Sequence, residues 1–184
     1  GIGYLVYASC VLGTILFAAS SFQQVGLLYT TASNAGFITG MYMVFVPIFG
    51  LMLGMATGLV TWLGCIVAAI GLFMLGVNDQ YRMGYGDLLQ LAGAGIWALH
   101  ILAIDHFTKH APGVQLACGQ FVVCAALGIL VSAGFAGETT TWPQLVAAGP
   151  TLIYAGIITV GVAYTLQIVA QAKANPVHAG IILS

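Results

Sequence analysis

The sequence is poor in charge. Only 4% of its 184 residues are charged, three being Lys or Arg and four Asp or Glu, whereas 61% are hydrophobic. A soluble domain carries about 25% charged residues, and a chain this poor in charge could not cover a surface that faces water. A net charge of −1 also excludes a basic surface for nucleic acid. We therefore expect a protein whose main solvent is the lipid bilayer.

Cysteine is scarce as well, and its spacing excludes most cysteine chemistry. No two cysteines have the spacing of a metal-binding or redox pair, and all lie inside apolar runs: Cys10, Cys65, Cys118 and Cys124. We interpret them as packing residues. His106 and His110 have the i, i+4 spacing of a metal-binding pair, but with their charged neighbours they are interpreted as a polar cap at a helix end. We expect no metal and no cofactor.

Long apolar runs dominate instead. Six runs have the length of about 20 residues that crosses a bilayer as a helix, and a seventh begins before the sequence ends. The predicted spans are roughly 4–28, 34–54, 58–77, 87–107, 114–135 and 150–171, with the seventh from 175 onward. Barrel strands alternate polar and apolar residues, and these runs do not. This predicts an all-α, polytopic transmembrane helix bundle, with Asn34 or Ser33 capping the second helix.

The stretches around Tyr29 and Ala172 share a pattern. In each, a long apolar helix is followed by a short polar turn and then by a helix that opens with small residues. Aligned without gaps, Ala32 matches Ala172 and Gly40 matches Gly180, an offset of 140 residues. An odd number of spans separates the two copies, so they cross the membrane in opposite directions. This predicts inverted-topology repeats, which recur in transporters that alternate access around a midplane site.

The few charges predict an orientation. The turns on one side of the membrane contain Lys109 and Lys173, and those on the other side contain Arg82 with Asp79, Asp87 and Glu138. By the positive-inside rule, the lysine side faces the cytoplasm. The expected location is the bacterial inner (plasma) membrane. The sequence begins without Met and ends within an apolar run, so we interpret it as a fragment.

Three motifs follow one another in order: Gly26–Ala35 with Pro47, then Gly86–Ala98, then Ala163–Gln167 running to Asn175–Gly180. They resemble three parts of the drug/metabolite transporter superfamily, in particular of its EamA-type members: the third-to-fourth helix junction, the opening of the sixth helix and the eighth-to-ninth junction. The resemblance covers essentially the whole chain and implies a ten-helix fold of two inverted five-helix repeats. One departure is that the turn 55–61 lacks the charged residues often found there.

The resemblance also implies a domain organisation and a function. Residues 1–77 would be the C-terminal part of the first repeat, with three spans, and residues 87–184 the second repeat, with three full spans and the start of a fourth. Loop 78–86 would join them. The implied function is alternating-access transport of a small organic metabolite or drug. Transport would be secondary active or facilitative, because no nucleotide-binding motif is present. The expected partners are the solute and the lipid bilayer, and a homodimer stays open.

Polar residues that share a helix face are the candidate pathway, because a polar side chain within lipid is costly without a partner. Tyr164, Gln167 and Gln171 lie at i, i+3 and i+7, and the 140-residue offset sets Gln24 opposite Tyr164. We predict that these four side chains line a substrate pathway. The alternative interpretation is that they form hydrogen bonds between helices of the bundle.

Four further residues are candidates by position. Trp97 and His100 share a predicted helix face, and either could line a cavity or pack. His178 aligns with Ile38 and lies one turn before the residue that aligns with Tyr42, so His178 and Tyr42 are also predicted to face the pathway.

Pro47 should kink its helix because it removes a backbone hydrogen bond. We predict a hinge for gating at Pro47, with a passive kink as the alternative.

Two alternatives to transport stay open. One is a membrane scaffold without a solute path. The other is an intramembrane aspartyl protease, because Gly84-Tyr85-Gly86-Asp87 matches the Gly-x-Gly-Asp motif of that class. Such chemistry needs two carboxylates that share a proton, and neither Asp79 nor Asp105 is placed to pair with Asp87. On sequence grounds, Asp87→Asn should abolish proteolysis but be largely tolerated by a transporter.

Overall fold

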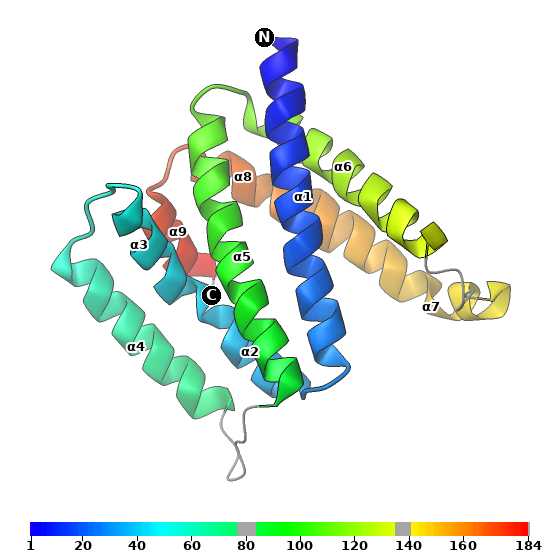
Figure 1. Ribbon diagram of the computed structural model, residues 1–184, viewed down its shortest axis with the longest axis horizontal. Helices are drawn as coiled ribbons and strands as arrows, with labels where there is room; N and C mark the ends of the chain where they lie inside the picture. The colour runs from blue at the N-terminus through cyan, green and yellow to red at the C-terminus, as the bar shows by residue number, and fades with distance from the viewer. Residues whose placement is uncertain (77–83, 135–140, 184) are drawn as a thin grey trace. The chain divides into compact units, whose positions relative to one another are not determined.

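Helices are the only regular structure in the part of the chain that the computed structural model describes, residues 1–76, 84–134 and 141–183 (Figure 1). In chain order they are α1 (Ile2–Leu27), α2 (Ala32–Gly40), α3 (Tyr42–Met52), α4 (Leu59–Gly76), α5 (Tyr85–Thr108), α6 (Gly113–Gly134), α7 (Trp142–Tyr154), the π-helical segment η1 (Ala155–Tyr164), α8 (Thr165–Gln171) and α9 (Pro176–Leu183). The predicted all-α, polytopic membrane bundle is confirmed. Asp79, Arg82 and Glu138, which entered the predicted orientation, lie outside the described residues.

Within the described residues, five stretches are long and apolar enough to cross a membrane: Ile2–Leu27, Ala32–Met52, Tyr85–Thr108, Gly113–Gly134 and Trp142–Gln171. Leu59–Gly71 is a shorter apolar stretch within α4. The last of the five begins earlier than the predicted Pro150, because Pro150 lies inside α7. The helix begins instead at Trp142, where the backbone N–H of Thr141 donates to Gln144 Oε1 at 2.9 Å. An interior proline is tolerated in a membrane helix, so Pro150 was a misleading boundary signal.

The N-cap of α2 also differs from the prediction. Thr31, rather than Ser33 or Asn34, is the cap, and its hydroxyl accepts from the Asn34 backbone N–H at 3.2 Å. Thr31 has the extended backbone that an N-cap requires. All three residues are good capping types, so composition alone could not choose among them.

The second span is interrupted at Met41, where α2 ends and α3 begins. Pro47 lies within α3 and is buried. Because proline has no N–H, the Met43 carbonyl loses its usual helical donor. The buried thiol of Cys65 on α4 approaches this carbonyl at 3.4 Å and donates a weak hydrogen bond to it. This contact ties α3 to α4 beside the proline.

The chain packs as two units. One comprises Gly1–Thr14 with Phe107–Lys173, and the other Ile15–His106 with Ala174–Ser184. Helix α1 contributes its first half to one unit and its second half to the other. The predicted repeats, 1–77 and 87–184, have other bounds than these two units. The repeats therefore stay a prediction.

In the first unit, α1 and α6 approach closely at glycine. A Cβ on Gly13 would lie 2.6 Å from Val123 Cβ and 2.7 Å from the Gln120 carbonyl oxygen. A Cβ on Gly119 would collide with the Ser9 side chain. Small residues at a membrane helix interface allow such close backbone contact. Helix α8 packs on α6 in the same unit.

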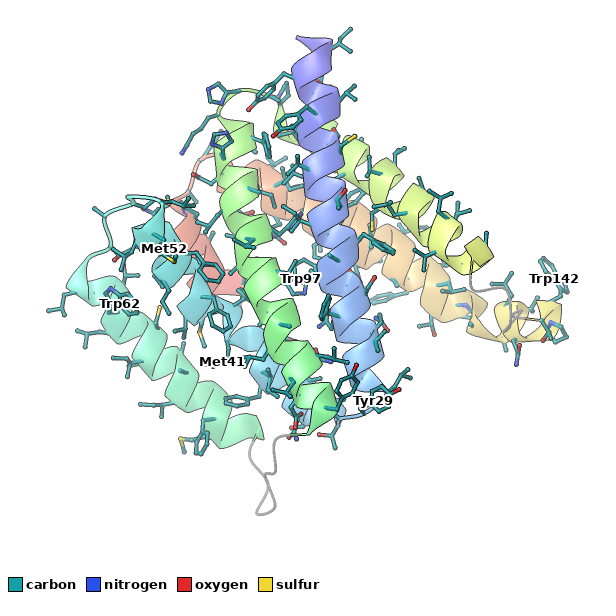
Figure 2. The ribbon with its side chains drawn as sticks, viewed as in Figure 1. Tyr29, Met41, Met52, Trp62, Trp97 and Trp142 are labelled. Atoms are coloured by element: carbon teal, nitrogen blue, oxygen red, sulfur yellow. The ribbon has the colours of Figure 1, made fainter. Side chains whose placement is uncertain are left out.

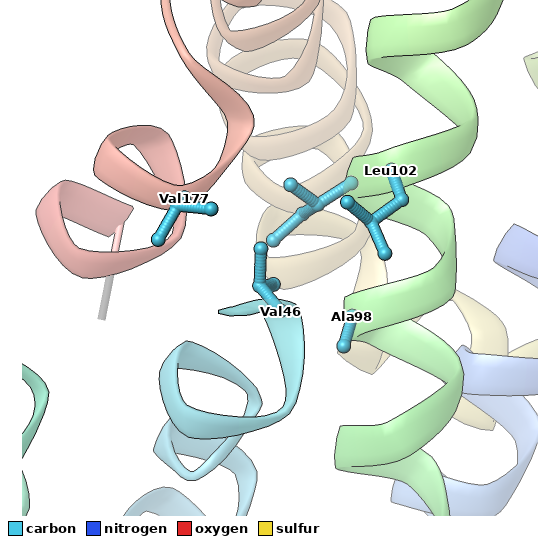
Figure 3. Close-up of a cluster of buried hydrophobic side chains, with 5 residues drawn as sticks. Val46, Ala98, Leu102 and Val177 are labelled. Carbon is cyan, nitrogen blue, oxygen red and sulfur yellow. The ribbon is translucent and has the colours of Figure 1, made fainter. Parts of the chain in front are cut away.

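The second unit has a hydrophobic cluster where three helices meet (Figure 3). Its members are Val46 of α3, Ala98, Ile101 and Leu102 of α5, and Val177 of α9. A Cβ on Gly180 would lie 3.3 Å from Val46 Cγ2, so α9 sits tightly on α3. Helix α4 packs on α2, α3 and α9.

Glycine also sets the approach of α1 to α5 in the second unit. A Cβ on Gly86 would lie 2.7 Å from the Gly26 carbonyl oxygen, 2.7 Å from the Tyr29 carbonyl carbon and 2.9 Å from the Thr30 nitrogen. All three are backbone atoms, which cannot move aside as a flexible side chain can. The edge of one ring faces the other in the Tyr29–Tyr85 pair, whose centroids are 5.3 Å apart, and this pair covers the same junction.

We therefore predict that Gly86→Ala lowers the free energy of unfolding by about 1–3 kcal/mol, because overpacking forces backbone shifts. The matched control is Gly95→Ala on the same helix, where an added Cβ meets nothing within 4 Å. That change should be neutral or stabilising by up to about 1 kcal/mol, since alanine favours the helix. Thermal unfolding of the full-length protein in detergent checks both. Equal stability of the two variants would contradict the close approach.

Candidate functional site

Polar side chains follow one face of α5. Asp87, Gln90, Trp97 and His100 are spaced by three, seven and three residues, which keeps them on one side of a helix with about 3.6 residues per turn. Asp87 and His100 are each 3% exposed and Gln90 is 0% exposed, although the outer face of the same helix carries Leu88 and Leu99 at 53% and 47%. A buried polar row in a membrane-spanning helix is costly unless each group has a partner.

Asp87 has partners for both carboxylate oxygens. Oδ2 accepts from the Gly84 backbone N–H at 2.8 Å, which caps the first turn of α5 as the acid of a capping box does. Oδ1 accepts a short hydrogen bond from the Thr30 hydroxyl, in the turn between α1 and α2. The carboxylate therefore joins the start of α5 to the α1–α2 turn.

Gln90, one turn further along α5, joins three helices. Its Nε2 donates to the Gln23 carbonyl oxygen of α1 at 2.9 Å. Its Oε1 accepts from the Thr39 hydroxyl of α2 at 3.2 Å. The buried amide thus uses both its donor and its acceptor end, as a side chain in a low-dielectric interior must.

Trp97 and His100 lie near the middle of α5, and Figure 2 labels Trp97 there. Their rings meet edge to face, with centroids 5.7 Å apart and planes at 83°. Tyr42 of α3 is half-buried and packs against the hydrophobic cluster that includes Ala98 and Ile101 of α5. The structure therefore gathers three of the predicted pathway residues around the middle of α5.

Two other predicted pathway residues of this unit are exposed, Gln24 on α1 and His178 on α9. Gln24 directly follows Gln23, the residue whose carbonyl binds Gln90. Ile182, one turn after His178, is 82% exposed. This face of α9 is therefore exposed within the unit.

The remaining predicted residues belong to the other unit. Tyr164 ends η1, while Gln167 and Gln171 lie on α8. Gln167 Nε2 donates to Gln171 Oε1 at 3.5 Å, and Gln171 is 3% exposed, so these two amides lie on one face of α8. A π-helical segment is rare and is often found at functional sites. A separate pocket of about 260 Å³ in this unit has Tyr4, His110 and Gln115 among its lining, and none of the predicted residues.

Several polar residues were not recognised from the sequence. Gln90, Thr30 and Thr39 make hydrogen bonds that join elements of the second unit, and Gln120 on α6 is fully buried. The available signal for Gln90 was its spacing, three residues before Gly93 on the face of Trp97 and His100. The signal for Thr30 and Thr39 was weaker, because isolated threonines in apolar stretches usually bond their own backbone.

The structure changes the interpretation of the Gly84–Asp87 motif. Asp87 is buried with both oxygens occupied, so the expectation that a transporter largely tolerates Asp87→Asn no longer follows. Asp105 lies on the same continuous helix, 18 residues further on (105 − 87), which is about 27 Å at a rise of about 1.5 Å per residue. These two carboxylates cannot share a proton.

Two proteins of Archaeoglobus fulgidus are similar in sequence, and each is named an uncharacterized transporter. One is 31% identical over 145 residues, which cover 70% of this chain and 43% of that protein. The other is 29% identical over 174 residues, which cover 88% of this chain and 56% of that protein. The chain thus spans about half the length of these relatives. No protein-family model matches the sequence.

The Thr30–Asp87 contact makes a prediction about stability. Thr30→Val and Asp87→Asn should each lower the free energy of unfolding by about 1–3 kcal/mol, because each leaves a buried polar group without its partner. The double variant should lose less than the sum, since both changes break one contact.

Unfolding of the full-length protein in detergent, followed by heat or denaturant, gives the three values. Thr159→Val is the matched control, because Thr159 is exposed on η1, and its effect should stay within about 0.5 kcal/mol. Strictly additive losses would show that the two side chains do not cooperate.

Proposed function

We propose that this protein is part of a membrane transporter that moves a small organic metabolite or drug by alternating access. The observation that carries the proposal is the buried polar face of α5, with Trp97 and His100 at its middle. Polar side chains within a membrane span are rare and mark solute or ion paths. The names of the two similar Archaeoglobus proteins support the same function.

The protein is proposed to be an EamA-type member of the drug/metabolite transporter superfamily, with two inverted repeats. The course of the chain supports this. In Figure 1, α3 rises from α2 toward the loop before α4, whereas α9 descends from the loop after α8. The 140-residue offset sets α9 against residues 36–43, which are the end of α2 and the start of α3. Helices α3 and α9 pack together in one unit. Opposite directions are what an inverted repeat requires.

Each unit by itself has residues that are proposed to face the solute. In one unit they are Gln24, Tyr42, Trp97, His100 and His178, and in the other they are Tyr164, Gln167 and Gln171. Aromatic rings and neutral amides dominate this set, which suits an uncharged or amphiphilic organic solute that crosses without a fixed counter-ion. Gradient-driven or facilitative transport fits a sequence without a nucleotide-binding motif.

Flux measurements with the full-length protein in proteoliposomes test the proposal. A panel of amino acids, nucleobases, sugars and amphiphilic drugs should contain at least one solute with saturable uptake. Trp97→Ala and His100→Ala should each lower that uptake about tenfold or more, equivalent to ~1.4 kcal/mol of lost interaction.

Matched controls are available for both changes. Trp62 on α4 bonds to Thr57 at 3.2 Å, and His106 is exposed near the end of α5. Trp62→Ala and His106→Ala should leave uptake within about twofold, because neither side chain lies on the polar face of α5. Absence of flux for every solute of the panel would favour a scaffold and overturn the proposal.

A further inference from the structure

We propose that Gln90 is the positioning residue of the solute path: it holds α1 and α2 against α5 so that Gln24 and Tyr42 take their places beside the polar face. This inference rests on the proposed function. Gln90 was not among the residues predicted from the sequence. It acts through its neighbours, and no contact with a solute is assigned to it.

The first argument is where the partners of Gln90 lie. Gln23, whose carbonyl accepts from Nε2, precedes Gln24 directly. Thr39, whose hydroxyl donates to Oε1, lies three residues before Tyr42 (42 − 39). One side chain therefore bonds to the neighbour of Gln24 on α1 and to the end of α2, three residues before Tyr42 opens α3.

The second argument is that the Gln90 amide has little room to move. A Cβ on Gly26 would lie 2.7 Å from Gln90 Nε2 and 3.1 Å from Cδ. The amide thus rests directly on the backbone of α1. One turn further along α5, Gly93 keeps the same approach, since its Cβ would lie 3.4 Å from Phe22 Cβ. A tightly packed amide with fixed partners restricts the positions of the helices that it contacts.

The third argument is the break at Met41. Helix α2 ends at Gly40 and α3 begins at Tyr42, and Met41 between them keeps right-handed dihedrals (φ −62°, ψ −12°), so the end of α2 sets where α3 starts. The Thr39–Gln90 bond anchors the last turn of α2 before this break. Beyond it, α3 is held by the Cys65 contact to Met43 and by Val46 in the hydrophobic cluster. Gln90 therefore fixes the end of α2, and the end of α2 determines where Tyr42, the first residue of α3, is placed.

Burial makes this arrangement specific. An amide that is 0% exposed has no water to replace a lost partner, so an arrangement with either end unbonded is disfavoured. Only the placement of α1 and α2 that satisfies both ends is well populated. Loss of Gln90 should accordingly release Gln24 and Tyr42 without removing either of them.

The test uses Gln90→Leu and Thr39→Val in the full-length protein in proteoliposomes. Gln90→Leu removes both bonds, and Thr39→Val removes one with almost no change of shape. The controls carry the same changes elsewhere: Gln120→Leu at a 0% exposed glutamine of α6, and Thr61→Val at an 8% exposed threonine of α4. For a solute that the wild-type protein carries, the two test variants should raise KM about fivefold or more, as one lost hydrogen bond of ~1 kcal/mol implies, and leave kcat within about twofold.

A second measurement needs no solute. In a Gln24→Cys background, a water-soluble maleimide labels position 24 in membranes, and mass spectrometry follows that peptide alone. Gln90→Leu and Thr39→Val should change the labelling rate about threefold or more, whereas the controls should leave it unchanged.

The outcomes separate the two proposals. No flux by the wild-type protein overturns the proposed function, and the labelling rate still decides the role of Gln90. Wild-type KM and wild-type labelling in Gln90→Leu overturn the positioning role, even if the variant melts at a lower temperature. A lower melting temperature alone would mean a merely structural amide. If Gln90→Leu does not fold, Thr39→Val gives the same two readings.

Discussion

The structure depends on one constraint: a polar group within lipid has to find its partner inside the protein. Asp87 and Gln90 show how the second unit satisfies it. Each uses both of its polar atoms. Gly84 caps α5 itself, and the other partners lie on other elements: Thr30 in the α1–α2 turn, Gln23 on α1 and Thr39 on α2. The same bonds that remove the cost of burial therefore fix the first turns of α5 against two other segments. Hydrophobic burial alone could not do this, because the lipid is as apolar as the helix faces.

Glycine makes these bonds geometrically feasible. Gly26 and Gly86 bring the backbones of α1 and α5 so close that an added methyl group would meet backbone or amide atoms at 2.7 Å. At that separation a glutamine side chain can reach from α5 to the α1 carbonyl. In the first unit Gly13 and Gly119 bring α1 close to α6 in the same way. Helix α1 thus uses glycine-mediated contact in both units, through different parts of its length.

Much of the fold follows from the sequence, and the reason is physical. Apolar runs long enough to cross a bilayer have few structural options, so the class and most of the helix bounds were predictable. Local chemistry was less decisive: Thr31 rather than Ser33 or Asn34 caps α2, and Pro150 lies inside α7 rather than at its start. The hydrogen-bond partners were beyond reach. Gln90 binds residues 67 and 51 positions away, and nothing in a single sequence reports such pairing. Trp97 and His100 were named as candidates because they share a helix face, whereas Gln90 on that face was missed.

The central claim is that the polar face of α5 borders a path for solute rather than a dry helix contact. Single cysteines along α5, labelled in membranes by a small water-soluble thiol reagent, test it most directly. The account predicts rapid labelling at positions 97 and 100, which water reaches through the path. Positions 88 and 99 are 53% and 47% exposed in the structure. The account places them against lipid and predicts little labelling there. Protection of positions 97 and 100 in every condition, with or without candidate solutes, would contradict it.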